Sequence, residues 1–133
     1  MTMEMLQSHP AGTGGLDATL LDACVKACYE CAQACTACAD ACLAEDLVAD
    51  MRRCIRGDHD CADLCETTGR VLSRRTAGDP AVLRAVLEAC LAACRACAEE
   101  CEKHADMHDH CRLCAQACRR CERACADLLA SLG

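Results

Sequence analysis

Cysteine dominates the chemistry available to this chain, because eighteen of its 133 residues are cysteines. Through residues 24–42 and 111–125 they recur at alternating gaps of three and four, the spacing of side chains along one face of a helix. A soluble helical bundle fills such positions with leucine and isoleucine. We therefore expect a helical core lined with thiols, which are soft metal ligands. The candidate ligands are Cys24, Cys28, Cys31, Cys35, Cys38, Cys42, Cys54, Cys61, Cys65, Cys90, Cys94, Cys97, Cys101, Cys111, Cys114, Cys118, Cys121 and Cys125.

Ligand type and charge favour Cu(I) as the metal. Cysteines four residues apart lie one helical turn apart, so each pair can hold an ion between two sulfurs, and soft thiolates prefer Cu(I). If each sulfur bridges two ions, metals and thiols are equal in number and the core is neutral. This removes the cost of burying uncompensated thiolates and predicts a load of about 15–20 Cu(I).

Two other function classes stay open. Zinc prefers four tetrahedral ligands, so a zinc-storage protein or a zinc-stabilised structural bundle would bind fewer ions and leave charged or protonated thiols. A thiol-redox protein would bind few metals and have one or two thiols of low pKa. An iron–sulfur protein is disfavoured, because no cysteine precedes a proline and the thiols fall on helices rather than in loops.

A second group of soft or borderline ligands lies near two expected helix–helix turns. His104, Met107, His108 and His110 surround one turn, and Met51 follows the other. Imidazole and thioether are neutral ligands that can receive Cu(I) and pass it to the thiols. The alternative interpretation is a polar, histidine-rich turn exposed to solvent.

Asp58 is the one acidic residue predicted to face the core. It stands four residues after Cys54 and three before Cys61, a position where an apolar side chain is expected. An inward aspartate can ligate a metal or accept hydrogen bonds, or it can face a water-filled gap, and the sequence leaves both open. His59 falls off this face and is expected to be exposed.

The expected architecture is all-α, an up-down-up-down four-helix bundle with a cysteine-lined core. Residues 1–16 contain Pro10 and three glycines and predict a flexible tail with at most a short helical turn before Pro10. Residues 17–133 are expected to form the metal-storage domain. In the turn between its second and third helices, Gly78 is expected to end one helix, while Asp79 caps the next and Pro80 begins it. The helices are expected at about 17–44, 46–75, 80–104 and 107–131.

The two ends of this bundle differ in chemistry. One end, here called the leucine end, is predicted to be a dry apolar plug. The other, the histidine end, carries the imidazole and thioether groups described above. The residues of the leucine end are Leu20, Leu21, Leu72, Leu83, Leu87, Leu128 and Leu132.

Composition limits the partners and the compartment. The net charge of −7 and the lack of a basic run argue against nucleic acid, and no segment is apolar enough to span a membrane. Residues 1–15 have neither a basic start nor an apolar stretch typical of an export signal. We therefore expect a cytoplasmic protein whose thiols are kept reduced, without a disulfide framework.

The cysteine pattern resembles the cytosolic branch of the bacterial copper storage proteins over about residues 17–131. The resemblance is carried by the runs CVKACYECAQACTACADAC, CLAACRACAEEC and CRLCAQACRRCERAC. It implies a storage protein rather than an enzyme, a four-helix bundle whose inward cysteines bind Cu(I), and an assembly that is commonly a homotetramer. It also implies copper uptake past histidines and methionines, which matches the histidine end. The expected partners are copper ions and, for copper transfer, a copper chaperone or a cuproenzyme that the sequence does not name.

Overall fold

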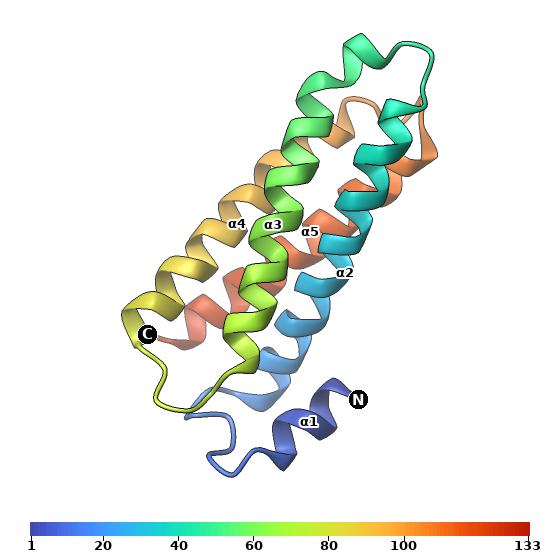
Figure 1. Ribbon diagram of the computed structural model, residues 1–133. Coiled ribbons are helices and arrows are strands. Elements are labelled where there is room, and N and C mark those ends of the chain that lie inside the picture. Colours follow the sequence, from blue (N-terminus) through green and yellow to red (C-terminus); the bar gives the residue numbers. More distant parts are fainter.

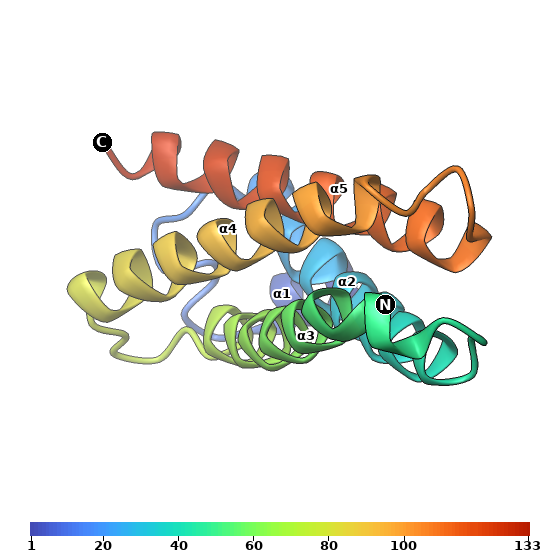
Figure 2. The same ribbon diagram turned by 90° about the horizontal axis from the view of Figure 1, so that it is seen from above.

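A computed structural model describes residues 1–133, and all of its regular secondary structure is helical. Helices α2 to α5 run alternately up and down, and α5 returns to pack against α2, which closes a four-helix bundle (Figure 1). Figure 2 shows the same bundle from above. This confirms the predicted up-down-up-down architecture. The elements are α1 (Thr2–Ser8), α2 (Ala18–Leu43), the 3₁₀ helix η1 (Val48–Met51), α3 (Arg52–Ser73), α4 (Pro80–Glu102) and α5 (Asp109–Ser131).

Two helix starts follow from the capping residues that the sequence offers. The carboxylate of Asp17 accepts a hydrogen bond from the backbone N–H of Leu20 at 3.0 Å, so α2 begins at Ala18. Asp79 accepts from the backbone N–H of Ala81 at 2.8 Å, and Pro80 occupies the first position of α4. Both caps satisfy amide groups that have no partner within the helix.

The end of α3 differs from the prediction. The helix stops at Ser73, before the glycine that was expected to end it. Ala77, with φ of 55°, is the residue of this turn in the left-handed region, while Gly78 is outside it. The prediction that Gly78 ends the helix is therefore wrong: Arg74 takes an extended conformation and ends α3 four residues earlier.

The first sixteen residues contain a helix that the sequence analysis limited to a short turn. Helix α1 lies beside the lower end of α2 in Figure 1 and buries Leu6, which is 5% exposed, against the bundle. A single leucine buried in this way contributes about 2 kcal/mol. The flexibility of this segment in solution stays a prediction.

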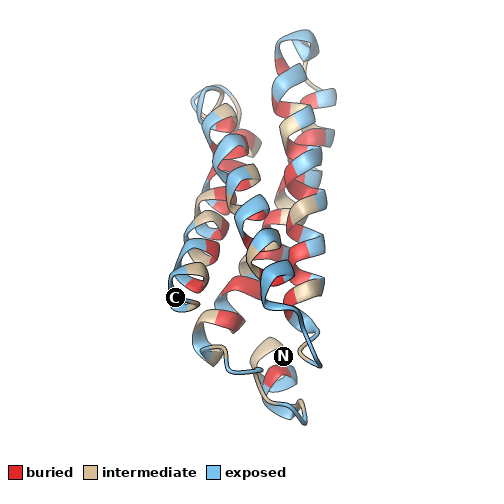
Figure 3. Cartoon of the chain, turned by 90° about the vertical axis from the view of Figure 1, so that its left-hand side faces the viewer, coloured by how far each residue is buried: buried red, intermediate tan, exposed pale blue.

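The core follows the predicted division into thiols and leucines. All eighteen cysteines are buried and free, and buried residues occupy the inner faces of the helices (Figure 3). At the leucine end Leu20 and Leu132 are half-buried. The fully enclosed leucines there are Leu21, Leu72, Leu87 and Leu128, and Leu83 is buried but 8% exposed.

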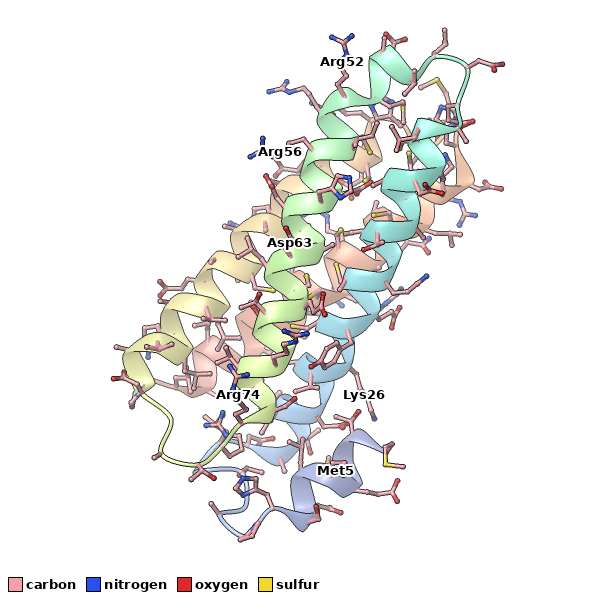
Figure 4. All side chains as sticks on the ribbon, viewed as in Figure 1. Met5, Lys26, Arg52, Arg56, Asp63 and Arg74 are labelled. Atoms are coloured by element: carbon pink, nitrogen blue, oxygen red, sulfur yellow. The ribbon has the colours of Figure 1, made fainter.

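The outside of the bundle is charged. Figure 4 shows sulfur atoms in the space between the helices, whereas Arg52, Arg56 and Arg74 extend away from it. Arg119 on α5 pairs with Glu102 of α4 at 2.7 Å, which ties two neighbouring helices at the surface. None of the helices has an apolar stretch long enough to cross a bilayer.

Candidate metal centre

The cysteine sulfurs form what we call the thiol column, which follows the axis of the bundle. Neighbouring sulfurs lie 3.5–3.9 Å apart, so one small ion can contact two or more of them. Sulfur–sulfur contacts join α2 to α5 and α3 to α4. The contacts between α2 and α5 include Cys24–Cys125 at 3.8 Å, Cys28–Cys121 at 3.7 Å and Cys31–Cys118 at 3.7 Å. Those between α3 and α4 include Cys65–Cys94 and Cys54–Cys101, both at 3.5 Å.

Most of these contacts join different helices rather than successive turns of one helix. Of the predicted pairs four residues apart, Cys31–Cys35 and Cys61–Cys65 lie in direct contact, each at 3.8 Å. The bundle brings four inner faces together, so a sulfur finds closer neighbours across the axis than along its own helix. Ligand pairing is thus a property of the tertiary structure.

Groups of four sulfurs lie within 4.8 Å of one another, and these groups share members. Cys35 and Cys118 belong to two groups, one with Cys31 and Cys61 and the other with Cys97 and Cys114. Because the groups overlap, ions bound along the column would have to share sulfurs. Bridging thiolates are therefore built into the arrangement, whereas isolated tetrahedral cages would need separate sets of ligands.

Burial keeps thiols at the histidine end of the thiol column protonated when no metal is bound. It raises the pKa of Cys42 to about 12, and it also raises the pKa of the Cys111 thiol. The cause is the removal of water from around the charged thiolate. A neutral thiol is a small hydrophobic group, so the column can form a dry core before any ion enters.

Asp58 lies inside the thiol column and is fully buried. Its Oδ1 accepts hydrogen bonds from the thiols of Cys97 at 3.0 Å, Cys114 at 3.3 Å and Cys101 at 3.6 Å. Burial and the neighbouring thiols raise the pKa of Asp58 to about 12, so the carboxyl group is neutral. Of the two possibilities left open by the sequence, the hydrogen-bonded environment is the one observed.

At the histidine end the structure brings His110 against the thiol column, with His108 stacked on it. Nδ1 of His110 lies 3.4 Å from the sulfur of Cys38 and 3.6 Å from that of Cys111. The His108 and His110 rings stack with centroids 5.3 Å apart. An ion held by His110 would therefore stand next to two thiols.

The other predicted residues of this end are more scattered. Met51 is buried, and His104 is half-buried with its Nδ1 enclosed and without a hydrogen-bond partner. Met107 is 67% exposed and lies on the surface. The structure therefore brings His110 to the column and His108 onto His110, and it leaves Met107 outside that group.

Glu45 is a polar residue of this end that the sequence analysis did not select. Its Oε2 lies 2.5 Å from Nδ1 of His108 and 3.2 Å from Nε2 of His110. Glu45 stands in the turn that follows α2, and both histidines stand at the start of α5. The sequence feature that could have identified Glu45 is its place in one of the two turns predicted to lie at the same end of the bundle as the histidines.

The comparison that decides the family covers almost all of the bundle. Residues 17–130 match the sequence profile described as copper storage protein. The chain belongs to the copper storage protein family. This family assignment confirms the resemblance seen in the cysteine runs and agrees with a storage protein rather than an enzyme.

Solved and curated relatives agree with the family. The chain is similar to Ccsp of Streptomyces lividans, a copper storage protein solved after loading with 10 copper equivalents, with 55% identity and a TM-score of 0.96 over 98% of this chain and 99% of that one. A cytosolic copper storage protein from the same organism, loaded with five coppers, is 59% identical over 86% of this chain and 96% of that one, with a TM-score of 0.85. The cysteine-rich protein YhjQ of Bacillus subtilis is 36% identical over 82% of this chain and 95% of its own length.

Proposed function

We propose that this protein stores copper as Cu(I), about one ion per cysteine, on the thiolates of the preformed bundle. The observation that carries the proposal is the thiol column: eighteen buried, free cysteines with sulfurs in mutual contact along the axis. Soft sulfur ligands favour Cu(I), and a load near the thiol count leaves the filled core neutral. The copper-loaded relatives from Streptomyces lividans support the choice of metal.

Filling the column is an exchange of protons for copper. Each entering Cu(I) displaces a thiol proton, and the proton leaves with the departing water or carrier ligand. A thiolate formed in this way can bridge to a second ion, since its next sulfur neighbour lies within 4 Å. The charge inside the bundle therefore stays near zero at every stage of loading.

Roles for the other predicted ligands follow from their positions. We infer that Met51, His104, Met107, His108 and His110 receive copper at the histidine end. Asp58 Oδ1 accepts hydrogen bonds from three thiols of the column, so it can exchange its own proton and ligate an ion there as the thiols ionise. The leucine end offers no ligand, so loading proceeds from the histidine end.

The compartment and the assembly are part of the proposal. Free thiols at this density persist in a reducing compartment, and the Streptomyces lividans relative is described as cytosolic, which supports a cytoplasmic location. The family resemblance implies a homotetramer, and we propose a copper chaperone or a cuproenzyme as the partner in copper transfer. Light scattering of the purified, reduced protein measures its oligomeric state directly.

Anaerobic titration of the reduced, metal-free protein tests the metal and the load. We expect Cu(I) binding to saturate near eighteen ions per chain, the number of thiols. A parallel titration with Zn(II) should saturate at a smaller number and be displaced by Cu(I). Saturation at four or five ions with a preference for Zn(II) would establish the zinc alternative instead.

A separate measurement addresses the thiol-redox alternative. A redox protein would have one or two thiols that react quickly with an alkylating reagent, because only the thiolate is nucleophilic. We expect slow alkylation of all eighteen cysteines in the metal-free protein, since each is buried. A fast phase of one or two thiols, together with a small copper load, would support the redox alternative.

A further inference from the structure

We propose that Glu45 is a positioning residue that sets opposite proton tautomers in His108 and His110, so that each histidine presents one unprotonated nitrogen to copper. The proposal deepens the proposed function and rests on it, because it explains how the histidine end is prepared for uptake. Glu45 itself need not touch the ion.

The geometry assigns one carboxylate oxygen to both rings. Oε2 of Glu45 lies 2.5 Å from Nδ1 of His108 and 3.2 Å from Nε2 of His110. A carboxylate oxygen accepts more than one hydrogen bond, and an ionised carboxylate can only accept. The nitrogen facing Glu45 in each ring must therefore carry the proton.

The two rings meet the same oxygen through different nitrogens, which gives them opposite tautomers. His108 is protonated at Nδ1, and its Nε2 keeps a lone pair. His110 is protonated at Nε2, and its Nδ1 keeps a lone pair. The thiols of Cys38 and Cys111 lie 3.4 and 3.6 Å from that Nδ1, where they can donate to it. The thiol donors at Nδ1 and the Glu45 acceptor at Nε2 thus favour the same tautomer of His110.

This arrangement matters because a protonated nitrogen cannot bind a metal. A histidine that ligates a metal is commonly oriented by a hydrogen bond from its other nitrogen to a carboxylate, and loss of that partner costs about 10–100-fold in affinity. Without Glu45, His108 would revert to the Nε2–H tautomer that a free histidine side chain prefers. Its ligand nitrogen would then be blocked or turned away.

Glu45 also comes from a different element from the histidines it orients. It stands in the turn after α2, whereas His108 and His110 are at the start of α5, with rings stacked 5.3 Å apart. The carboxylate, Glu45, is 29% exposed, so carrier ligands can reach this end of the bundle. The same contact therefore joins two turns and prepares two ligand nitrogens.

The test compares Glu45→Ala and Glu45→Gln with the parent protein, using Asp46→Asn as a matched control on the adjacent, exposed carboxylate. Nitrogen-15 NMR of the histidine rings is recorded on metal-free protein above the imidazole pKa values. The rate of Cu(I) uptake from a Cu(I)–chelator complex and the total load are measured on the same samples. Circular dichroism checks that each variant is folded.

We expect the parent and Asp46→Asn to show the Nδ1–H tautomer at His108 and the Nε2–H tautomer at His110. In Glu45→Ala, His108 should switch to Nε2–H and uptake should slow about tenfold, while the total load is unchanged. Glutamine has one acceptor oxygen and an N–H₂ group, so Glu45→Gln should preserve one tautomer and slow uptake less. If the alanine variant does not fold, the glutamine variant decides the question.

Unchanged tautomers in both variants would overturn the proposal, and so would switched tautomers with an unchanged uptake rate. The total load separates this outcome from a failure of the proposed function. A low Cu(I) load in the parent itself would contradict copper storage, whereas a full load with no effect of Glu45 would reject only the positioning role.

Discussion

Asp58 Oδ1 lies 3.0 Å from the sulfur of Cys97 in a position with no access to water. The pair places the one buried acid of the bundle inside a core of buried thiols. Burial makes ionisation of this carboxyl group costly, and it therefore retains its proton at neutral pH. In the unfolded chain the same group is ionised at neutral pH, because its ordinary pKa is 3.8.

Replacing Asp58 should therefore stabilise the metal-free protein at neutral pH. The pKa is raised on folding, so the contribution of Asp58 to stability is full below about pH 4 and falls as pH rises toward 12. Asp58→Asn keeps the size and shape of the side chain but has no carboxyl group that must take up a proton on folding. We expect its free energy of unfolding at pH 7 to exceed that of the parent by about 4 kcal/mol, with the difference disappearing near pH 4.

Urea denaturation of chelated, reduced protein at several pH values measures this difference. Asp63→Asn, on the exposed face of the same helix, is the matched control and should leave stability and its pH dependence unchanged. If Asp58→Asn were less stable than the parent at pH 7, the carboxyl group would be ionised in the native state and its environment would differ from the one described.

Proton release provides a second test of the neutral core. Burial raises the pKa of thiols such as Cys42 and Cys111, so these groups enter the reaction protonated. At neutral pH we expect about one proton released for each Cu(I) bound, and a weaker affinity as the pH falls. A pH indicator in weakly buffered, anaerobic solution counts the protons. Far fewer protons than ions would mean that the thiolates exist before the metal arrives.

The bundle should fold without copper, because its leucine end and its neutral thiols already form an apolar core. Circular dichroism of the metal-free protein should show mostly helix. Leu87→Ala, which opens a cavity at a fully buried site, should lower the free energy of unfolding by about 2–5 kcal/mol while leaving the copper load intact. Leu113→Ala, at a 53% exposed site on α5, should have little effect. A disordered metal-free chain would contradict this prediction.

Much of this structure could be predicted from the sequence because its signals are local. Cysteine gaps of three, four and seven specify one inward face for each helix, and Asp17 and Asp79 specify two helix starts. These features depend on neighbours a few residues away. They predicted both the thiol column and the up-down-up-down arrangement of the helices.

What the sequence could not provide are contacts between distant segments. The contact of Glu45 with His110 joins residues 65 positions apart, and no local pattern marks it. The same holds for the thiols, which pair across helices more than along them. Ala77, and not the neighbouring Gly78, takes the left-handed conformation in the turn between α3 and α4, and no local pattern marks this choice either.

The histidine end provides the final prediction, which concerns the rate of copper movement and not its amount. His104 and His108 are partly exposed and lie between solvent and the thiol column, and Met107 is on the surface beside them. Neutral imidazole and thioether ligands hold Cu(I) less firmly than anionic thiolates, so ions can pass inward to the column. The opposite end is closed by leucines and has no such ligands.

Replacing His104, Met107 and His108 together with alanine should slow both uptake and removal of Cu(I) about tenfold, while the total load remains near the thiol count. The load is unchanged because all eighteen column sulfurs remain. Stopped-flow mixing with a Cu(I)–chelator complex measures uptake, and excess chelator measures removal. His59→Ala, on the exposed face of α3, is the matched control and should leave both rates unaltered. Equal rates in the triple variant and the parent would mean that copper reaches the column by another path and that these residues form only a solvated turn.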